Sequence, residues 1–350
     1  MTEPTYIPLR LHTEFSITDG MVRIKKLIAK AQEYGLPALG ISDLMNEFGL
    51  VKFYKACRGA GIKPIGAADV WIGNPNAPDK PFRAMLIIRN DAGYLRLSEL
   101  LTAAYVGKDR NVHHAELNPE WLENGDNSGL ICLSGAHYGE VGVNLLNGNE
   151  DAARAAALKY SAWFPDAFYL ELQRLPERPE WEACVSGSVK LAEELSLPVV
   201  ATHPTQFMSS DDFNAHEARV CIAGGWVLTD KKRPRDFTPS QFFIPPETML
   251  ERFADLPEAL ENTVEIAKRC NLHITLGKNF LPLFPTPDGL SLDDYLVKLS
   301  NEGLQERMVQ LYPDEAERAA KMPEYQERLD FELNIIIQMK FPGYFLIVQD

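Results

Sequence analysis

The side chains best suited to chemistry lie near the start of the chain, where His12 and Asp19 follow a short apolar run. Imidazole nitrogens and carboxylate oxygens are lone-pair donors that bind divalent cations in proteins. His12 would leave the carboxyl end of a strand and Asp19 would follow in the next loop. The residue two before His12, on the same face of that strand, is Arg10. A guanidinium has no lone pair, so this stretch predicts a metal site that has lost a ligand.

Strand and helix signals alternate along most of the chain and would position these side chains. Apolar runs predict seven strands, at residues 6–11, 36–42, 62–72, 82–88, 129–133, 168–172 and 197–202. Helical spacing predicts helices at 24–31, 50–58, 92–105, 152–163, 181–195 and 213–222. Strands followed by helices indicate parallel pairing through right-handed crossovers. Polar residues recur after successive strands, which favours an α/β barrel over an open sheet.

The alternation stops near residue 247, and helices follow. Periodicity predicts helices over 256–270 and 325–339, and Ser291 with the acidic residues after it predicts a helix N-cap. A proline-punctuated connector is expected at 280–287. These changes place a domain boundary near residue 275, which gives domains of 1–275 and 276–350.

Composition argues against several classes of protein. A net charge of -14 does not suit a surface that grips a nucleic-acid backbone, and the basic run at 231–235 is expected to be a solvated loop. The sequence contains no glycine pattern of a dinucleotide site or a P-loop. No apolar stretch approaches the roughly 20 residues of a membrane span, and the start lacks the core of a signal peptide. The five scattered cysteines fit reduced thiols, so we expect a cytoplasmic protein without a membrane partner.

Several strings that follow one another along the chain are typical of one family. They are HTEFSITDG at 12–20, GLVKFY at 49–54, GIKPI at 61–65, LPVVAT at 197–202, AHE at 215–217, NTVEIA at 262–267 and FPGYFLIV at 341–348. With them the chain resembles the N-terminal part of the alpha subunits of bacterial DNA polymerase III, the replicative polymerases. The resemblance implies a PHP domain over 1–275, with a distorted seven-stranded (β/α) barrel. It also implies that 276–350 is the truncated, mainly helical start of the polymerase palm.

Metal-bearing PHP domains hold a cluster of divalent cations with about nine His, Asp, Glu and Cys ligands. The resemblance maps three retained ligand types onto His12, Asp19 and Asp69. The positions that it maps as lost ligands are Arg10, Leu44, Arg83, Ala136, Pro204 and Gln206. Three ligands suffice for a single zinc but not for a bridged cluster that clamps a phosphoester. We hypothesise that Arg10 and Arg83 supply the positive charge instead, paired with Asp19, Asp43 or Asp69.

The retained residues also have structural interpretations. Asp19 could be the N-cap of the helix that follows it, and His12 could be a hydrogen-bonded core histidine. His137 and His203 stand beside lost ligand positions and could each offer a stray ring nitrogen. The acidic string at 211–217 is expected to be a helix N-terminus rather than a metal site.

The resemblance implies an activity for the full-length protein that this fragment would lack. The whole protein would be a DNA-directed DNA polymerase, a nucleotidyltransferase that uses magnesium. The fragment would be catalytically inert and need no cofactor, because 276–350 offers no motif for paired metal-binding carboxylates. Its first domain would be a scaffold and docking surface for the proofreading exonuclease (epsilon) subunit, beside the remainder of the alpha subunit, and would meet DNA only through the full-length protein. The alternative is a metal-dependent phosphoesterase or 3'-5' exonuclease with a reduced metal site.

Overall fold

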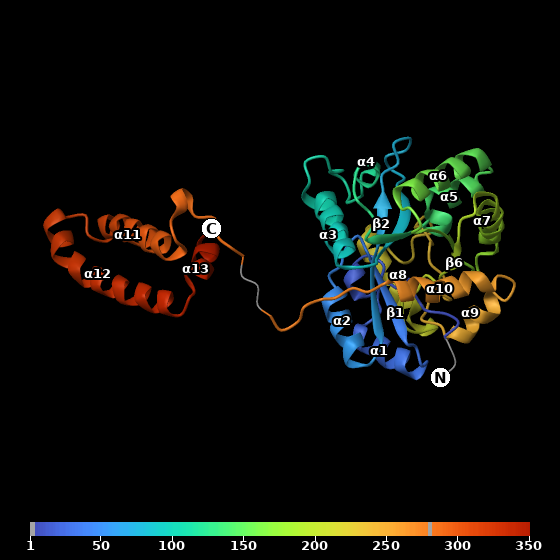
Figure 1. The fold of residues 1–350 in the computed structure, drawn as a ribbon, viewed down its shortest axis with the longest axis horizontal. Helices are drawn as coiled ribbons and strands as arrows, with labels where there is room; N and C mark the ends of the chain where they lie inside the picture. Colours follow the sequence, from blue (N-terminus) through green and yellow to red (C-terminus); the bar gives the residue numbers. More distant parts are fainter. Residues whose placement is uncertain (1–3, 279–281) are drawn as a thin grey trace. The chain divides into compact units, whose positions relative to one another are not determined.

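The chain forms two compact units, Met1–Ile274 and Thr275–Asp350. The structure is a computed structural model that describes residues 4–278 and 282–350 (Figure 1). Part of the connector predicted at 280–287 therefore lies outside the described residues. The first unit alternates strands with helices, and the second is helical.

One curled, six-stranded half-barrel sheet is the framework of the first unit, and its strands lie in chain order (Figure 1). The strands are β1 (Ala38–Leu44), β2 (Lys63–Ile72), β3 (Phe82–Ile88), β4 (Leu130–Leu133), β5 (Phe168–Leu172) and β6 (Val199–Ala201). β1 pairs parallel with β2, β4 with β5, and β5 with β6. β3 is antiparallel to both β2 and β4.

Two features of the predicted sheet are wrong. It is not wholly parallel, because the connection between β2 and β3 contains no helix and the chain simply turns back. The segment predicted as a strand at 6–11 is extended but joins no ladder, so the described residues contain six strands. This segment still bonds to β1: the Gly40 N–H donates to the Pro8 carbonyl at 2.8 Å, and the Ser42 N–H donates to the Leu11 carbonyl at 2.9 Å. The next residue, His12, donates its N–H to the Thr205 carbonyl in the loop after β6, at 2.9 Å. Pro8 has no N–H, which interrupts a regular ladder.

The helices of the first unit precede, connect or follow these strands. They are α1 (Ile24–Glu33), α2 (Leu50–Gly59), α3 (Asp91–Val106), α4 (Pro119–Glu123), α5 (Glu140–Leu146), α6 (Glu150–Trp163), α7 (Glu182–Leu195), α8 (Phe213–Gly224), α9 (Pro246–Arg252) and α10 (Pro257–Arg269). α1 buries the apolar residues that the sequence placed on one helical face, so that prediction is confirmed. α1 begins at Ile24 with Arg23 in the N-cap position, and the interpretation of Asp19 as its cap is therefore wrong.

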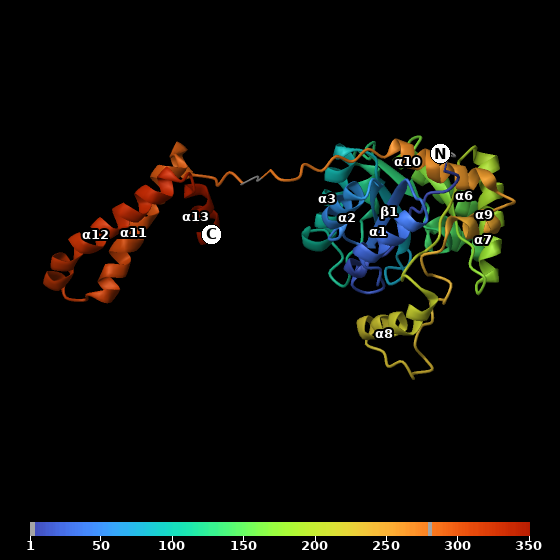
Figure 2. The same ribbon diagram turned by 90° about the horizontal axis from the view of Figure 1, so that it is seen from below.

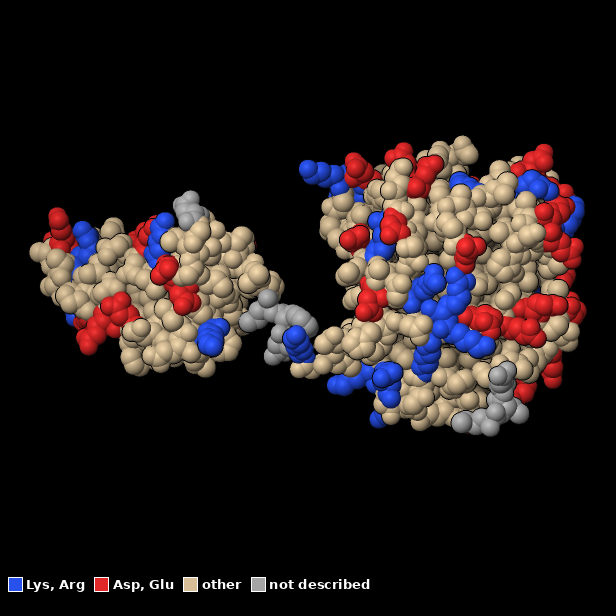
Figure 3. Space-filling model, viewed as in Figure 1, with Lys and Arg blue, Asp and Glu red and all other residues tan. Residues whose placement is uncertain are grey.

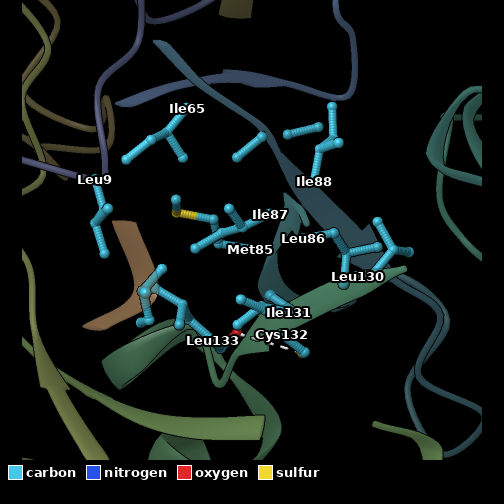
Figure 4. Close-up of a cluster of buried hydrophobic side chains, with 14 of the residues drawn as sticks. Leu9, Ile65, Met85, Leu86, Ile87, Ile88, Leu130, Ile131, Cys132 and Leu133 are labelled. Atoms are coloured by element: carbon cyan, nitrogen blue, oxygen red, sulfur yellow. Dashed lines mark hydrogen bonds between the residues drawn. The ribbon is translucent and has the colours of Figure 1, made fainter. Parts of the chain in front are cut away.

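The middle of the sheet forms the main core. Every residue of β4 is buried, as are the last five residues of β3. Strands that are buried on both faces read as continuous apolar runs, which is why these two were predictable. Figure 4 shows side chains of both strands, among them Met85 and Ile131, in one apolar cluster with Leu9 and Ile65. The extended N-terminal segment thus contributes to the core even though it is not a strand.

α8 and the segment after it stand away from the rest of the first unit (Figure 2). Ser209 forms a capping box before this helix, so the acidic string at 211–217 leads into a helix N-terminus, as predicted. The basic run at 231–235 follows and is exposed except for Arg233. Arg233 is buried in an ion pair with Glu217 at 2.5 Å, so the run is not solvated throughout.

The second unit is built from helices with a small apolar core of its own. They are α11 (Leu292–Leu311), α12 (Glu315–Gln338) and α13 (Pro342–Gln349). Ser291 caps α11, as predicted, by accepting a hydrogen bond from the Asp294 N–H. α12 starts ten residues before the predicted 325, because Asp314 supplies an N-cap there. In the described parts of the chain no single helix could cross a membrane, and α12 with α13 passes that test only as a pair bent by 113°.

Candidate functional site

The strand ends of the first unit meet at a cavity of about 190 Å³. Residues that follow parallel strands gather at one edge of a curled sheet, and the antiparallel β3 brings its first residues to the same edge. The residues predicted from the metal pattern that line the cavity are Arg10, His12, Asp19, Leu44, Asp69, Arg83, Pro204 and Gln206. Ala136 is buried beside it, between Gly135 and His137, which both line the cavity.

Asp69, on β2, is the centre of a charged cluster in this cavity. Its Oδ2 accepts hydrogen bonds from the guanidinium groups of Arg10 and Arg83, the second at 2.5 Å. His12 Nε2 lies 3.1 Å from the same oxygen. Burial would raise the pKa of Asp69, but the two arginines outweigh it and hold that pKa well below its usual range. Oδ2 already accepts three donors and has no lone pair left for a cation. Oδ1 is buried and has no hydrogen-bond partner among the described residues.

His12 lies between two carboxylates, and both of its ring nitrogens are engaged. Nδ1 is 3.0 Å from Asp19 Oδ1, and Nε2 is 3.1 Å from Asp69 Oδ2. Burial lowers the pKa of His12, yet Asp19 and Asp69 outweigh burial and raise it to about 9. The ring is therefore an imidazolium at neutral pH. An imidazolium donates from both nitrogens and has no lone pair for a metal.

Arg10 makes a second ion pair, which the sequence did not reveal. Its guanidinium donates two hydrogen bonds to Glu171 of β5, at 2.7 and 2.9 Å. Glu171 also accepts from the Thr202 hydroxyl at 2.5 Å and from the Gly135 N–H at 3.1 Å. A glutamate inside an otherwise apolar strand needs a buried partner, and this was the signal in the sequence. The Arg10 cluster is defined as Arg10, His12, Asp19, Asp69, Arg83 and Glu171.

Of the three carboxylates proposed from the sequence as arginine partners, the arginines select Asp69. Asp19 binds His12 instead. Asp43 accepts from the Thr13 N–H at 2.6 Å and from the Ser16 hydroxyl at 3.0 Å, so neutral donors satisfy it. Asp43 therefore positions the turn that follows His12 and takes no part in the Arg10 cluster.

The two histidines beside positions predicted to have lost a ligand differ in where they lie. His137 lines the cavity with its ring stacked on Trp181, 3.5 Å between centroids, and burial lowers the pKa of His137 to about 3. Neither of its ring nitrogens has a hydrogen-bond partner among the described residues. His203 is not among the lining residues, and its Nε2 lies 2.9 Å from the Phe242 carbonyl. His137 thus meets the cavity as a neutral ring, whereas His203 belongs to the surrounding structure.

The charges of the Arg10 cluster balance within the protein. Its cations are Arg10, His12 and Arg83, and its anions are Asp19, Asp69 and Glu171. Across residues 4–278 and 282–350, no group of three or more His, Cys, Asp and Glu side chains is arranged to hold a metal ion. Buried ion pairs of good geometry fix the strands that carry them, and removing one partner leaves an uncompensated charge. The arrangement is therefore suited to holding β2, β3 and β5 together around the N-terminal segment.

Two segments match known families, and the whole chain matches known proteins. Residues 8–175 match the family described as "PHP domain", and residues 294–350 match "Bacterial DNA polymerase III alpha NTPase domain". The chain is 98% identical over 350 residues to "DNA polymerase III subunit alpha" of Neisseria meningitidis serogroup A, covering 100% of the chain and 31% of that protein. The subunit of Escherichia coli K12 is 47% identical over 350 residues, covering 100% of the chain and 30% of that protein.

The same subunit of Pseudomonas fluorescens is 47% identical over 349 residues, which is 99% of the chain and 29% of that protein. The chain thus spans about 30% of the length of these curated relatives. The PHP match covers β1 to β5 and therefore most strands that surround the cavity. The second match begins inside α11, in the second unit.

Proposed function

We propose that this chain, which belongs to the bacterial DNA polymerase III alpha subunits and corresponds to their N-terminal region, acts as a scaffold rather than as a metal-dependent hydrolase. Residues 1–275 are its PHP domain, a distorted barrel in which the N-terminal segment takes the place of a seventh strand. Residues 276–350 begin the polymerase palm. The full-length protein performs DNA-templated nucleotide addition with magnesium, in the cytoplasm.

The observation that carries the scaffold role is the engagement of Asp69 by both Arg10 and Arg83. A divalent cation bound to Asp69 would lie close to two guanidinium groups and the His12 imidazolium, and the repulsion is strong in a buried site. Leu44 and Pro204 add side chains without lone pairs. The residues present do not fit the metal cluster of the PHP family, so we derive no hydrolytic step through metals.

The alternative function, a metal-dependent phosphoesterase or 3'-5' exonuclease, is tested by metal analysis of the full-length subunit. After incubation with zinc or manganese and removal of free metal, we expect far less than one equivalent in the PHP domain. We also expect no chelator-sensitive release of phosphate or of 3' nucleotides. One tightly held equivalent together with such activity would overturn the scaffold role.

We propose that the scaffold's partner is the proofreading exonuclease subunit, and that DNA is reached only through the full-length protein. The net charge of -14 supports the second point. On the face of the first unit in Figure 3, basic side chains gather in one patch with acidic side chains around it. Co-elution of the full-length subunit with the exonuclease subunit at micromolar concentration is the test. Separate elution of the two subunits would contradict the docking role.

The chain by itself is expected to be inert in nucleotide addition. Asp293 and Asp294 lie in the first turn of α11, where the helix dipole favours acidic side chains, so their role is structural. Extension of a primed template by the chain alone, with magnesium present, is expected to stay at background. Extension above the level of a no-protein control would contradict this assignment.

A further inference from the structure

A second hollow in the first unit, of about 470 Å³, is apolar where the first cavity is charged. It lies between the loop after β1 and one face of α3, from Tyr94 to Val106. Its lining includes Glu47, Phe48, Tyr94, Leu101, Tyr105 and Val106. Glu47 is the charged member of this described lining, and we name the hollow the Glu47 groove.

Large apolar side chains at the rim of the Glu47 groove are in contact with solvent. Phe48 is 64% exposed and Val106 is 70% exposed, and Tyr105 is also exposed. Single exposed apolar residues are common on protein surfaces, but several around one concavity mark a surface that binds another molecule. The size of the hollow suits protein side chains rather than a single ion.

The loop that carries Phe48 is held by specific hydrogen bonds. Met45 has a left-handed backbone, φ 53°, and its N–H donates to the Asp69 carbonyl at 2.8 Å. The Asn46 amide donates to the Phe15 carbonyl at 3.0 Å, and its Oδ1 accepts from the Phe48 N–H at 3.1 Å. A non-glycine residue keeps such a backbone only where its surroundings fix it. The exposure of Phe48 is therefore built into the fold.

Glu47 places an incompletely paired carboxylate in the groove. The Ser98 hydroxyl donates to its Oε2 at 3.1 Å, whereas its buried Oε1 has no hydrogen-bond partner within the described residues. Burial raises the pKa of Glu47 to about 7, against the opposing effect of Ser98. A buried carboxylate oxygen without a donor destabilises the protein. A lysine or arginine supplied from outside would satisfy it with a charge-assisted hydrogen bond.

We propose that the Glu47 groove binds an apolar protein segment with one lysine or arginine, which pairs with Glu47 while its apolar side chains cover Phe48 and Val106. Charge complementarity selects the basic residue, because the described lining offers one acid and no cation. Aromatic side chains around one desolvated ion pair are typical of the energetic centre of an interface. The assignment rests on the proposed function: the segment belongs to the proofreading exonuclease subunit rather than to a second copy of the chain or to the rest of the polymerase.

Binding of the purified exonuclease subunit to the full-length polymerase subunit tests this assignment. Glu47→Lys and Phe48→Ser, made separately, are each expected to weaken the complex by about 30-fold, the size of a hot-spot loss. Glu47→Gln keeps the shape but removes the charge, so it is expected to weaken binding less than Glu47→Lys. The matched control is Leu95→Ser, because Leu95 is 62% exposed on α3 but does not line the groove. That variant is expected to bind like the unaltered subunit.

The outcomes separate this assignment from the docking role. An unaltered subunit that fails to bind the exonuclease overturns the docking role and this assignment with it. An unaltered subunit that binds, and keeps its affinity after Glu47→Lys and Phe48→Ser, overturns the groove alone. Equal losses in Leu95→Ser and Phe48→Ser overturn it too, because the effect is then not specific to the groove. If Ile222→Ser, at the exposed end of α8, weakens binding of the exonuclease subunit and the groove variants do not, the contact lies at α8 and the groove assignment is overturned.

Discussion

The cavity that holds the Arg10 cluster and the Glu47 groove are two hollows of one domain, and they differ in how their charged groups are paired. In the cluster each charged side chain meets an opposite charge inside the protein, and Arg10 alone joins two carboxylates. In the groove one carboxylate keeps an oxygen without a donor, and the surrounding side chains are apolar and partly exposed. Asp69 Oδ1 and Glu47 Oε1 are both buried without a donor, so the two hollows do not differ in that respect. They differ because Asp69 has cations of the protein on its other oxygen, whereas Glu47 has the Ser98 hydroxyl there. A cation from a partner would therefore add to the groove what the cluster already contains.

A cavity that collects the predicted ligand positions is therefore not by itself evidence of a metal site. The cavity holds the residues that the metal pattern singled out, yet its positive charge comes from arginine and histidine side chains. The groove contains none of the positions that the metal pattern singled out, yet its one acid has no cationic partner in the described lining and its aromatic rim is exposed.

The largest effect is expected from Arg10→Met, which leaves Asp69 and Glu171 in the core without their shared partner. Removal of one side of a buried ion pair costs about 3–5 kcal/mol, so the free energy of unfolding should fall by that amount. Urea unfolding of the first unit, followed by its tryptophan fluorescence, measures the loss.

The control is Arg154→Met, because Arg154 pairs with Glu194 at the surface, where both side chains are exposed. Exposed pairs contribute about 0–1 kcal/mol, so this variant should stay close to the unaltered protein. Similar losses in the two variants would show that the Arg10 cluster is no more important to stability than a surface pair.

An intermediate effect is expected from Glu47→Gln, and it depends on pH. The folded-state pKa of about 7 lies above the usual value of 4.5, so the protonated form favours folding. That contribution is complete below pH 4.5 and is lost as the pH rises through 7. At pH 8 the glutamine variant should be more stable by about 2 kcal/mol, after allowance for partial exposure.

The other titratable groups that line the groove are Tyr94 and Tyr105, both from α3, and phenols are uncharged in this range. Glu99→Gln is the control, because Glu99 is an exposed acid on the same helix. Thermal unfolding between pH 5 and 8 gives both profiles. A Glu47→Gln profile parallel to that of the unaltered protein would place the Glu47 carboxylate in ordinary solvent.

A smaller effect on stability is expected from Phe48→Ser. The side chain is exposed in the free protein, so the free energy of unfolding should change by less than about 0.5 kcal/mol. Phe53→Ala, in the buried face of α2, should cost about 3–5 kcal/mol by comparison. A large loss from Phe48→Ser would mean that Phe48 packs within the fold and that the rim is not free.

The smallest effect is expected from added zinc or manganese. Ligands that bind the folded state raise the unfolding temperature with concentration. The cations around Asp69 oppose such binding, so the unfolding temperature of the first unit should stay constant to within the error of the melt. A rise that grows with metal concentration and disappears in Asp69→Asn would restore a metal site to the cavity.

Local sequence patterns predicted the strands and helices well, but they predicted poorly which distant side chains pair with one another. The apolar face of α1 and the continuous apolar run of β4 depend on neighbours along the chain, and both were predictable. β3 runs antiparallel to β2 because the connection from β2 to β3 contains no helix, and strand signals alone do not reveal this. Glu171 could be suspected as a buried acid, but its pairing with Arg10 joins residues 161 positions apart. The role of Glu47 depends on burial between two elements, for which the sequence carries no local mark.

The hydrogen bond from the Met45 N–H to the Asp69 carbonyl ties the two hollows together. Asp69 anchors the Arg10 cluster through its side chain and the groove loop through its backbone. A substitution at the predicted ligand positions around Asp69 would therefore also alter the groove loop, and binding at the groove would keep those positions under selection. Across relatives, we expect residues of the Arg10 cluster to covary with those of the loop at 45–48. A compound that binds in the cavity beside Asp69 would then weaken binding of the partner at the Glu47 groove without occupying the groove.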